Sequence, residues 1–378
     1  MKTHTAVRQV LIHLLIDILL TAVFLVIFAL FHHVIPRQSQ SVGIVIENPY
    51  KRPPAEDSNT SRLPEGSRLI AASGSLSDVS FTSKGGNRNG SQSRGGTVNS
   101  SKGGSALSET GEETEDVQYD TPIWEKFSEM YTESIAVTDT SYQSSDISVT
   151  VTQETLENGD ITYYLADIYL RDITCFQSVL AGNTYGTGYR QEIPAMAENA
   201  SALIAINGDY YGNTNEGVVI RNGVIYRANP TTCDVCILYY DGSMRVIPGS
   251  QFSVEEAIAD GAWQAWTFGP ALLNTDGSVL TDFSSTRRII AANPRTAIGY
   301  YEPGHYCMIV VDGRGESAGI TLPELSQLFY DLGCTVAYNL DGGNSSVMVW
   351  DGEVINTPSG GGRASSDALV IAEVSQYE

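Results

Sequence analysis

The sequence predicts an α+β protein: one strand-rich globular domain, with a mixed sheet and a few flanking helices, behind a membrane anchor and a disordered linker. Three observations predict this organisation. Residues 10–31 are almost entirely apolar, and residues 38–118 are rich in Ser, Gly, Asn and Thr. In residues 122–378, short β-prone runs alternate with Asn-Gly and Asp-Gly turns, which are typical of β-hairpins.

The apolar run is long enough to cross a bilayer as one helix. Lys2 and Arg8 lie before it, which favours a short cytoplasmic N-terminus at residues 1–9. No small-residue cleavage site follows, so an uncleaved signal anchor is favoured over a cleaved signal peptide. We therefore expect a single-pass cell-membrane protein, held in the membrane by residues 10–31, with its C-terminal domain extracytoplasmic.

The Ser- and Gly-rich stretch is expected to be a flexible linker. Its central part, from Ser83 to Ser105, has almost no large apolar side chain. Such a segment cannot bury enough apolar surface to offset the conformational entropy lost on ordering. The linker would hold the domain away from the membrane.

The domain contains two predicted helices and several predicted strands. Runs at 147–151 and 161–170 alternate between apolar and polar residues, as strands do. One helix is predicted at about 194–200. A second begins with a capping box formed by Thr321 and Glu324, and it ends at a glycine. Each helix leads into an apolar strand that ends in a polar motif.

Composition excludes several kinds of function. The chain has 22 basic and 44 acidic residues, so its net charge of −22 argues against a nucleic-acid partner. Of five histidines only His305 lies beyond residue 33, which argues against multi-histidine zinc sites, and it is predicted to be a surface residue in a turn. Cys233 and Cys236 resemble half of a zinc knuckle, but no second pair completes it, and Cys236 is expected to be buried in a strand.

Carboxylates and arginines remain as the candidate chemical groups. Asp209, Asp312 and Asp341 lie at predicted strand ends, and Arg295 and Arg314 lie at comparable places. Paired carboxylates suit cleavage at an anomeric carbon, and a guanidinium can bind two phosphate oxygens at once. For Asp341, which precedes two glycines, a plain β-hairpin turn remains the alternative.

The motifs together resemble the phosphodiester glycosidase family, in unbroken order over about residues 145–374. They are residues 205–211 (AINGDYY), 268–270 (FGP), 294–299 (PRTAIG), 311–314 (VDGR), 339–346 (NLDGGNSS) and 356–359 (NTPS), with Arg363. Two positions depart from the family pattern. Asp209 stands between the Asn-Gly and the aromatic pair, and Asn344 replaces a third glycine.

The resemblance implies that residues 122–378 form a phosphodiester glycosidase-like domain that hydrolyses a sugar-1-phosphate diester and releases the sugar. It implies two sets of site residues. The catalytic set is Asp341, Asp312, Arg295 and Arg314. The substrate-binding set is Asn207, Asp209, Thr296, Asn339, Gly342, Gly343, Ser345, Ser346 and Arg363.

In this hypothesis Asp341 acts as nucleophile or general base, and Arg295 and Arg314 bind the phosphate. Asp312 positions a sugar hydroxyl or an arginine, or helps to hold a metal ion; a divalent cation is thus left open, and no other cofactor is expected. The expected substrate is a cell-envelope glycan or an exopolysaccharide. The alternative is a non-catalytic carbohydrate-binding module on the cell surface. The sequence leaves the sugar, the aglycone and the oligomeric state open.

Overall fold

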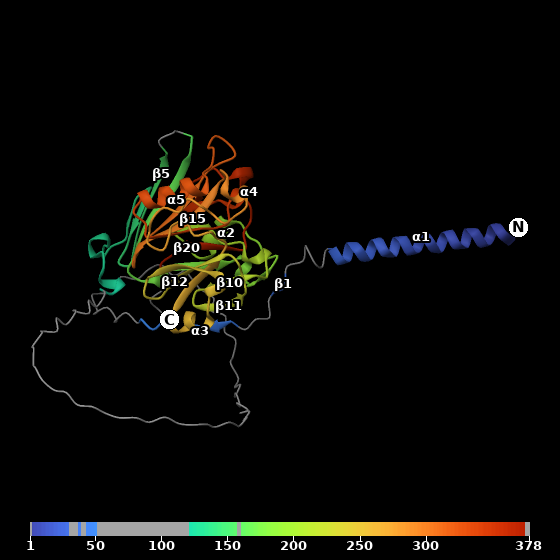
Figure 1. The fold of residues 1–378 in the computed structure, drawn as a ribbon, viewed down its shortest axis with the longest axis horizontal. Coiled ribbons are helices and arrows are strands. Elements are labelled where there is room, and N and C mark those ends of the chain that lie inside the picture. The colour runs from blue at the N-terminus through green and yellow to red at the C-terminus, as the bar shows by residue number, and fades with distance from the viewer. Residues whose placement is uncertain (1, 30–36, 39–42, 51–120, 157–159, 375–378) are drawn as a thin grey trace, which may run out of the picture. The chain divides into compact units, whose positions relative to one another are not determined.

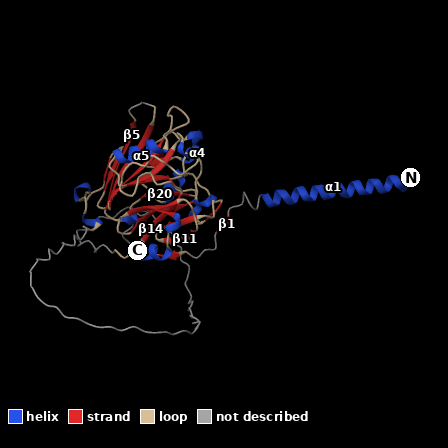
Figure 2. Ribbon diagram, in the orientation of Figure 1, coloured by secondary structure: helices blue, strands red, loops and turns tan. Residues whose placement is uncertain are grey.

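The computed structural model describes residues 2–29, 37–38, 43–50, 121–156 and 160–374 (Figure 1). Strands dominate the region from residue 136 onward (Figure 2), so the predicted strand-rich α+β class is confirmed. The described strands form four sheets in which every pairing is antiparallel, whereas the sequence predicts a single mixed sheet.

The seven-stranded sheet carries three of the predicted site motifs. Its strands, in spatial order, are β17 (Val336–Asn339), β15 (Arg295–Glu302), β16 (His305–Val311), β6 (Thr162–Leu170), β5 (Ile147–Thr155), β4 (Ser141–Gln143) and β3 (Ala136–Val137). The strands predicted at 147–151 and 161–170 are thus confirmed as β5 and β6.

Two further sheets complete the main body, and a fourth has only two strands. The five-stranded sheet has the order β19 (Glu353–Val354), β18 (Met348–Trp350), β9 (Ile204–Asn207), β20 (Asp367–Ile371) and β7 (Phe176–Leu180). The six-stranded sheet has the order β13 (Met244–Pro248), β12 (Asp234–Tyr239), β14 (Ala262–Thr267), β10 (Gly217–Arg221), β11 (Val224–Asn229) and β2 (Ile44–Val45). The pair consists of β1 (Arg37–Gln38) and β8 (Gly186–Thr187).

One large core fills the space between the three larger sheets, because alternate residues of each strand point to opposite faces. On β16, Tyr306, Met308 and Val310 belong to this central cluster. The alternate residues, Cys307, Ile309 and Val311, pack on the other face of the sheet with Leu325 and Phe329 of α5 (Leu322–Asp331). Helix α2 (Ile193–Asn199) covers the outer face of the five-stranded sheet in the same way.

Both predicted helices are confirmed. The capping box at the start of α5 forms as expected, with Thr321 accepting from the backbone of Glu324 and the Glu324 side chain accepting from the backbone of Thr321. The two shorter helices are α3 (Val254–Ala259) and α4 (Arg287–Ile290). Helices α4 and α5 lie at one end of the domain and α3 at the other (Figure 1).

The N-terminal segment differs from the prediction. Residues Lys2–Ala29 form helix α1, but within the described part of the chain no helix is both long and apolar enough to cross a membrane. The transmembrane anchor predicted at residues 10–31 is therefore not confirmed; residues 30 and 31 lie outside the described part.

The linker predicted from residue 38 is wrong for its first residues. Strand β2 pairs with β11, and the amide of Ile46 donates to the carbonyl of Gly223 at 2.7 Å. Ile46 is buried in the central core. Burial of its apolar side chain offsets the conformational entropy that this segment loses on ordering. Residues 51–118 of the predicted linker lie outside the described part.

Candidate functional site

Strand β17 delivers Asp341 to the place where ends of three strands meet. The amide of Leu340 donates to the carbonyl of Thr296 on β15 at 2.8 Å. The amide of Asp341 donates to the carbonyl of Gly208, directly after β9, at 3.3 Å. The backbone on both sides therefore fixes the position of this carboxylate.

The Asp341 carboxylate accepts hydrogen bonds on both oxygens. Its Oδ2 accepts from Arg363 Nη2 at 2.6 Å and from Ser345 Oγ at 2.8 Å, and its Oδ1 accepts from the amide of Gly342 at 3.0 Å. Burial raises the pKa of Asp341, and the bonds from Ser345 and Arg363 act in the opposite direction. The residue is 8% exposed, whereas the Arg363 side chain is 41% exposed, so Arg363 connects this carboxylate to the solvent.

Two glycines follow Asp341, one required by a close contact and the other by its backbone conformation. A Cβ on Gly342 would lie 2.8 Å from the carbonyl oxygen of Pro294, which is closer than real side chains come. Gly343 has φ +69°, a left-handed conformation that favours glycine, and its Cβ position faces the guanidinium of Arg314 at 3.1 Å. The glycine pair thus brings the backbone against the loop before β15 on one side and against an arginine on the other.

Arg314 lies at the rim of the site. It is exposed, its backbone is left-handed with φ 61°, and its guanidinium donates to Asn344 Oδ1 at 3.0 Å and to Asn293 Oδ1 at 2.8 Å. Asn344 stands where the family pattern has a third glycine, and here its side chain orients this arginine. Among the ion pairs of the described residues, Arg314 has no carboxylate partner.

Asp312 is held by a separate set of donors. Its carboxylate accepts from Asn356 Nδ2 at 2.9 Å and from the amide of Thr357 at 3.0 and 3.1 Å. Burial raises its pKa, and these donors lower it. Asn356 also donates to the carbonyl of Ser346 at 3.1 Å, which links Asp312 to the segment that follows Asp341.

Arg295 is buried and uses its donors on the backbone. Its guanidinium donates to the carbonyls of Ile289 and Ala291 and, at 3.3 Å, of Ile320. Burial and then the nearby charge of Arg314 lower the pKa of Arg295 to about 10. The two arginines are therefore close in space, but Arg295 holds the loop before β15 rather than reaching the surface.

Four other predicted ligands lie behind the site. Asn207, Thr296, Asn339 and Ser346 are each fully buried. Asn207 Nδ2 donates to the carbonyl of Asp341 at 2.7 Å, and its Oδ1 accepts from Thr296 Oγ1 at 2.7 Å. Asn339 donates to the carbonyl of Gly269 at 2.8 Å. Their arrangement supports the loops around Asp341, and their contact with substrate stays a prediction.

Asp209 belongs to a buried ion cluster instead of the Asp341 site. Its Oδ1 lies 2.8 Å from Arg221 Nη2, and the same nitrogen lies 2.8 Å from Asp367 Oδ2. The amide of Thr267 donates to the other Asp209 oxygen at 2.8 Å. Burial raises the pKa of Asp367 to about 7, with Arg221 opposing that rise. This cluster connects β10, β20 and the segment after β9.

Sequence reasoning missed several residues that shape the site. Asn356 and Thr357 lie within a quoted motif, but nothing in the motif indicated that they bind Asp312. Tyr210 also went unassigned. Its backbone is left-handed, with φ 71°, its side chain is 37% exposed, and the Arg363 guanidinium lies 5.7 Å from the centre of its ring.

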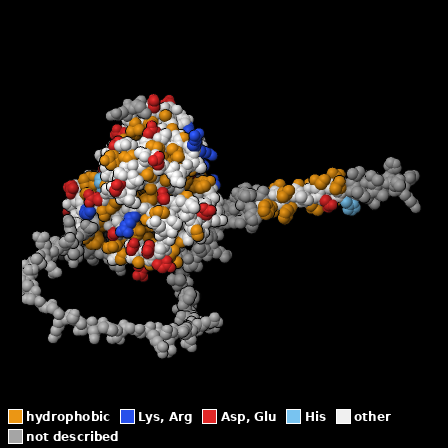
Figure 3. Space-filling view, in the orientation of Figure 1, with side chains coloured by type: hydrophobic (Ala, Val, Ile, Leu, Met, Phe, Trp, Pro, Cys, Tyr) orange, Lys and Arg blue, Asp and Glu red, His pale blue; other side chains and the backbone are white. Residues whose placement is uncertain are grey.

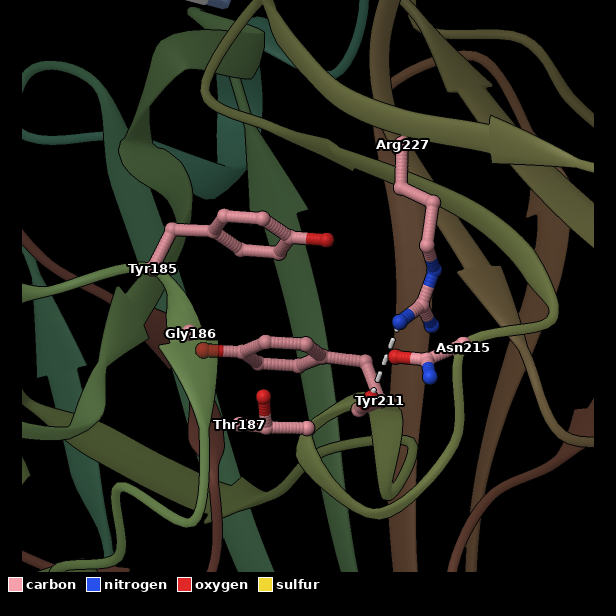
Figure 4. Close-up of a pocket in the computed structure, with 6 residues that line it drawn as sticks. All are labelled: Tyr185, Gly186, Thr187, Tyr211, Asn215 and Arg227. Atoms are coloured by element: carbon pink, nitrogen blue, oxygen red, sulfur yellow. Dashed lines mark hydrogen bonds between the residues drawn. The ribbon is translucent and has the colours of Figure 1, made fainter. Parts of the chain in front are cut away.

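A small cavity of about 60 Å³ is lined by Tyr185, Gly186, Thr187, Tyr211, Asn215 and Arg227. Tyr185 and Tyr211 stack above one another in it, and Arg227 donates to the carbonyl of Tyr211 at 3.1 Å (Figure 4). Ligand pockets usually have roughly 300–1,000 Å³. We therefore assign no sugar to this cavity.

The described residues contain no group of three or more His, Cys, Asp or Glu side chains placed to hold a metal ion. Cys236 is buried, as expected, and Cys233 is exposed. His305 is not the surface residue that the sequence predicts. It stacks between Tyr169 and Tyr301, and its Nε2 lies 2.7 Å from Asp167 Oδ1, because β6 and β16 are neighbouring strands.

Comparisons with known proteins point to the same family as the motifs. Residues 200–372 match the family model for phosphodiester glycosidase. The SPβ prophage-derived uncharacterized protein YomE of Bacillus subtilis (strain 168) is 32% identical over 196 residues, which cover 50% of this chain and 30% of that protein. The human N-acetylglucosamine-1-phosphodiester α-N-acetylglucosaminidase is 36% identical over 77 residues, 20% of this chain and 15% of the enzyme.

This chain thus spans at most 30% of the length of these curated relatives. Among solved structures, the catalytic domain of zebrafish N-acetylglucosamine-1-phosphodiester α-N-acetylglucosaminidase, auto-inhibited by its pro-peptide, aligns with a TM-score of 0.49 and 20% identity. That alignment covers 61% of this chain and 83% of the zebrafish chain. All of the quoted motifs, from residue 205 to Arg363, lie within the residues 200–372 that match this family model.

Proposed function

We propose that this domain hydrolyses a sugar-1-phosphate diester at the anomeric carbon, releasing the sugar and leaving a phosphomonoester. The arrangement of Asp341 carries the proposal. A buried carboxylate at the end of a strand is paired with Ser345 and with a half-exposed Arg363, inside the stretch that matches the family model. Perturbed carboxyl groups with specific charge partners are typical of catalytic sites.

Asp341 acts in this proposal as nucleophile or as general base. Arg363 and Ser345 bind the same oxygen, Oδ2, which favours the ionised carboxylate that either role needs. Oδ1 accepts only from the amide of Gly342 among the described residues, so it retains a lone pair for attack. Asn207 positions the group through its bond to the carbonyl of Asp341.

The arginines at the rim bind the phosphate in this proposal. Arg314 and Arg363 present exposed guanidinium groups, and Arg295 lies behind Arg314. Figure 3 shows Lys and Arg side chains gathered at the edge where Figure 1 labels α4, which contains the exposed Arg287 and Arg288. In a chain with net charge −22, this local excess of positive charge favours an anionic substrate.

Asp312 and Tyr210 have supporting roles in the proposal. Asp312 is fixed by three hydrogen bonds, so it orients the segment after Asp341 or a sugar hydroxyl. Tyr210 offers a partly exposed ring next to Arg363, on which a sugar ring can stack. An aromatic residue in left-handed backbone is strained, and such strain is concentrated at functional sites.

The natural source of the substrate is a finer part of the proposal. We propose a cell-envelope glycan or an exopolysaccharide as that source, with the domain acting outside the cytoplasm. The sequence supports this through Lys2 and Arg8, which precede the apolar run of residues 10–31. Incubating the purified chain with isolated cell envelopes and with capsular polysaccharide should release free sugar. Release of sugar only from soluble nucleotide sugars would contradict the proposed source of the substrate and leave the proposed reaction standing.

The reaction itself is tested with UDP-N-acetylglucosamine and related sugar-phosphate diesters. Free sugar should accumulate with the wild-type chain and should not accumulate with Asp341→Asn. Parallel reactions with a chelator decide whether a divalent cation takes part. Binding of the diester without any release of sugar would overturn the proposal in favour of the carbohydrate-binding module.

A further inference from the structure

Two thiols meet behind the candidate site. The sulfur atoms of Cys307 and Cys334 are 3.7 Å apart, and both residues are buried in the apolar cluster under α5. Cys307 lies on β16, and Cys334 lies between the end of α5 and the start of β17. All five cysteines of the chain are free thiols in this structure.

The strand between them leaves room for the contact. Gly299 on β15 pairs with Cys307 on one side and with Ala337 of β17 on the other. A Cβ on Gly299 would lie 2.6 Å from the sulfur of Cys307 and 2.8 Å from that of Cys334. The two sulfur atoms therefore occupy the space that a side chain at Gly299 would fill.

We propose that Cys307 and Cys334 form a disulfide when the chain meets a disulfide oxidant such as oxidised glutathione. One cysteine thiolate attacks a glutathione sulfur, which gives a mixed disulfide and releases one glutathione thiol. The second cysteine thiolate attacks the mixed disulfide, forms the Cys307–Cys334 bond and releases the second glutathione thiol. Two S–H bonds of the protein are lost, and their protons and electrons end on glutathione.

The disulfide would covalently link the segments that lead to the candidate site. Strand β16 leads directly to Asp312, β17 leads to Asp341, and β15 between them begins with Arg295. The bond closes the segment from 307 to 334, which contains Arg314 and α5. The closed loop therefore reduces the conformational freedom of the unfolded chain over a segment that, in the folded domain, helps to position Asp312 and Asp341.

Burial determines when the bond forms. Loss of solvent around Cys307 raises its pKa far above the usual range, so the thiolate needed for exchange is scarce in the folded chain. Oxidation should thus be slow in the folded chain and efficient during refolding. Both conditions belong in the test.

The test uses the full chain with Cys233→Ser, which removes the exposed thiol. The chain is refolded from denaturant in a glutathione redox buffer, and a folded sample is oxidised in parallel. We expect an intact mass lower by two hydrogen atoms and a cross-linked peptide pair containing Cys307 and Cys334. The buried thiols of Cys175 and Cys236 are internal controls and should remain open to alkylation after denaturation.

Two variants and one physical readout complete the test. Cys307→Ala and Cys334→Ala should each abolish the mass change. Oxidation should raise the Tm of the Cys233→Ser chain by on the order of 5–10 °C and leave that of the Cys334→Ala chain unchanged. The proposal is overturned if Cys307 and Cys334 remain alkylatable after both treatments, or if Cys334→Ala loses the same two hydrogens.

Discussion

Replacing Arg221 with methionine is expected to destabilise the domain strongly. The Arg221 side chain is 1% exposed and lies 2.8 Å from both Asp209 and Asp367. Methionine keeps much of the volume and removes the charge, so two buried carboxylates lose their cation. Breaking a buried ion pair in this way costs about 3–5 kcal/mol. At about 2–4 °C per kcal/mol for a domain of this size, the Tm should fall by roughly 6–20 °C.

The loss of stability in Arg221→Met should depend on pH in a defined direction. Burial raises the pKa of Asp367 to about 7 in the folded chain, above the value of about 3.9 for an unfolded aspartate. A raised folded pKa gives stability that is fully present below the unfolded pKa and is lost as the pH rises through the folded pKa. Arg221 favours the ionised form, so its removal raises the pKa of Asp367 further. The destabilisation should therefore be larger at pH 8 than at pH 5.

Thermal unfolding followed by circular dichroism at both pH values measures this effect. Arg245→Met is the matched control, because the Arg245 side chain is 61% exposed and lies 3.8 Å from Asp260. If Arg221→Met melts no lower than Arg245→Met, the ion cluster does not stabilise the fold. A deficit that is equal at pH 5 and pH 8 would refute the assignment of the raised pKa to Asp367.

Three further predictions concern the site. Arg363→Met should move the acid limb of the kcat/KM profile to higher pH, because a charge-assisted hydrogen bond that lowers the pKa of Asp341 is lost; an unshifted limb would contradict this prediction. Gly342→Ala should lower Tm and activity because its Cβ meets a carbonyl oxygen at 2.8 Å, whereas Gly315→Ala, with open space around its Cβ, should keep the wild-type Tm. Tyr210→Ala should raise KM more than it lowers kcat, and an unchanged KM would exclude stacking of the sugar on this ring.

Local signals in the sequence predicted local structure correctly. The capping box of Thr321 and Glu324 specifies the start of α5 through two reciprocal hydrogen bonds between residues three apart. Alternation over residues 161–170 specifies β6 because one face of the strand is buried. The motif around Asp341 indicated a strand that ends at a glycine corner; a close contact explains Gly342, and a left-handed φ explains Gly343.

Long-range partners could not be read from the sequence. Arg221 and Asp367 are 146 residues apart, on β10 of the six-stranded sheet and β20 of the five-stranded sheet, and they meet only in the folded chain, where both sheets share the central core. Asn356 and Asp312 are 44 residues apart and likewise meet only in the folded chain. Burial of Ile46 was also missed, because a run of three apolar residues is a weak signal inside a polar stretch.

The substitution Asp341→Asn tests the central claim most directly. The measurement is the rate of sugar release from UDP-N-acetylglucosamine by the wild-type and variant chains, with circular dichroism to show that both are folded. We predict release by the wild type and a loss on the order of 10³-fold or more in the variant, as for other residues that act on the reacting atoms. Near-normal release by a folded Asp341→Asn chain would contradict it.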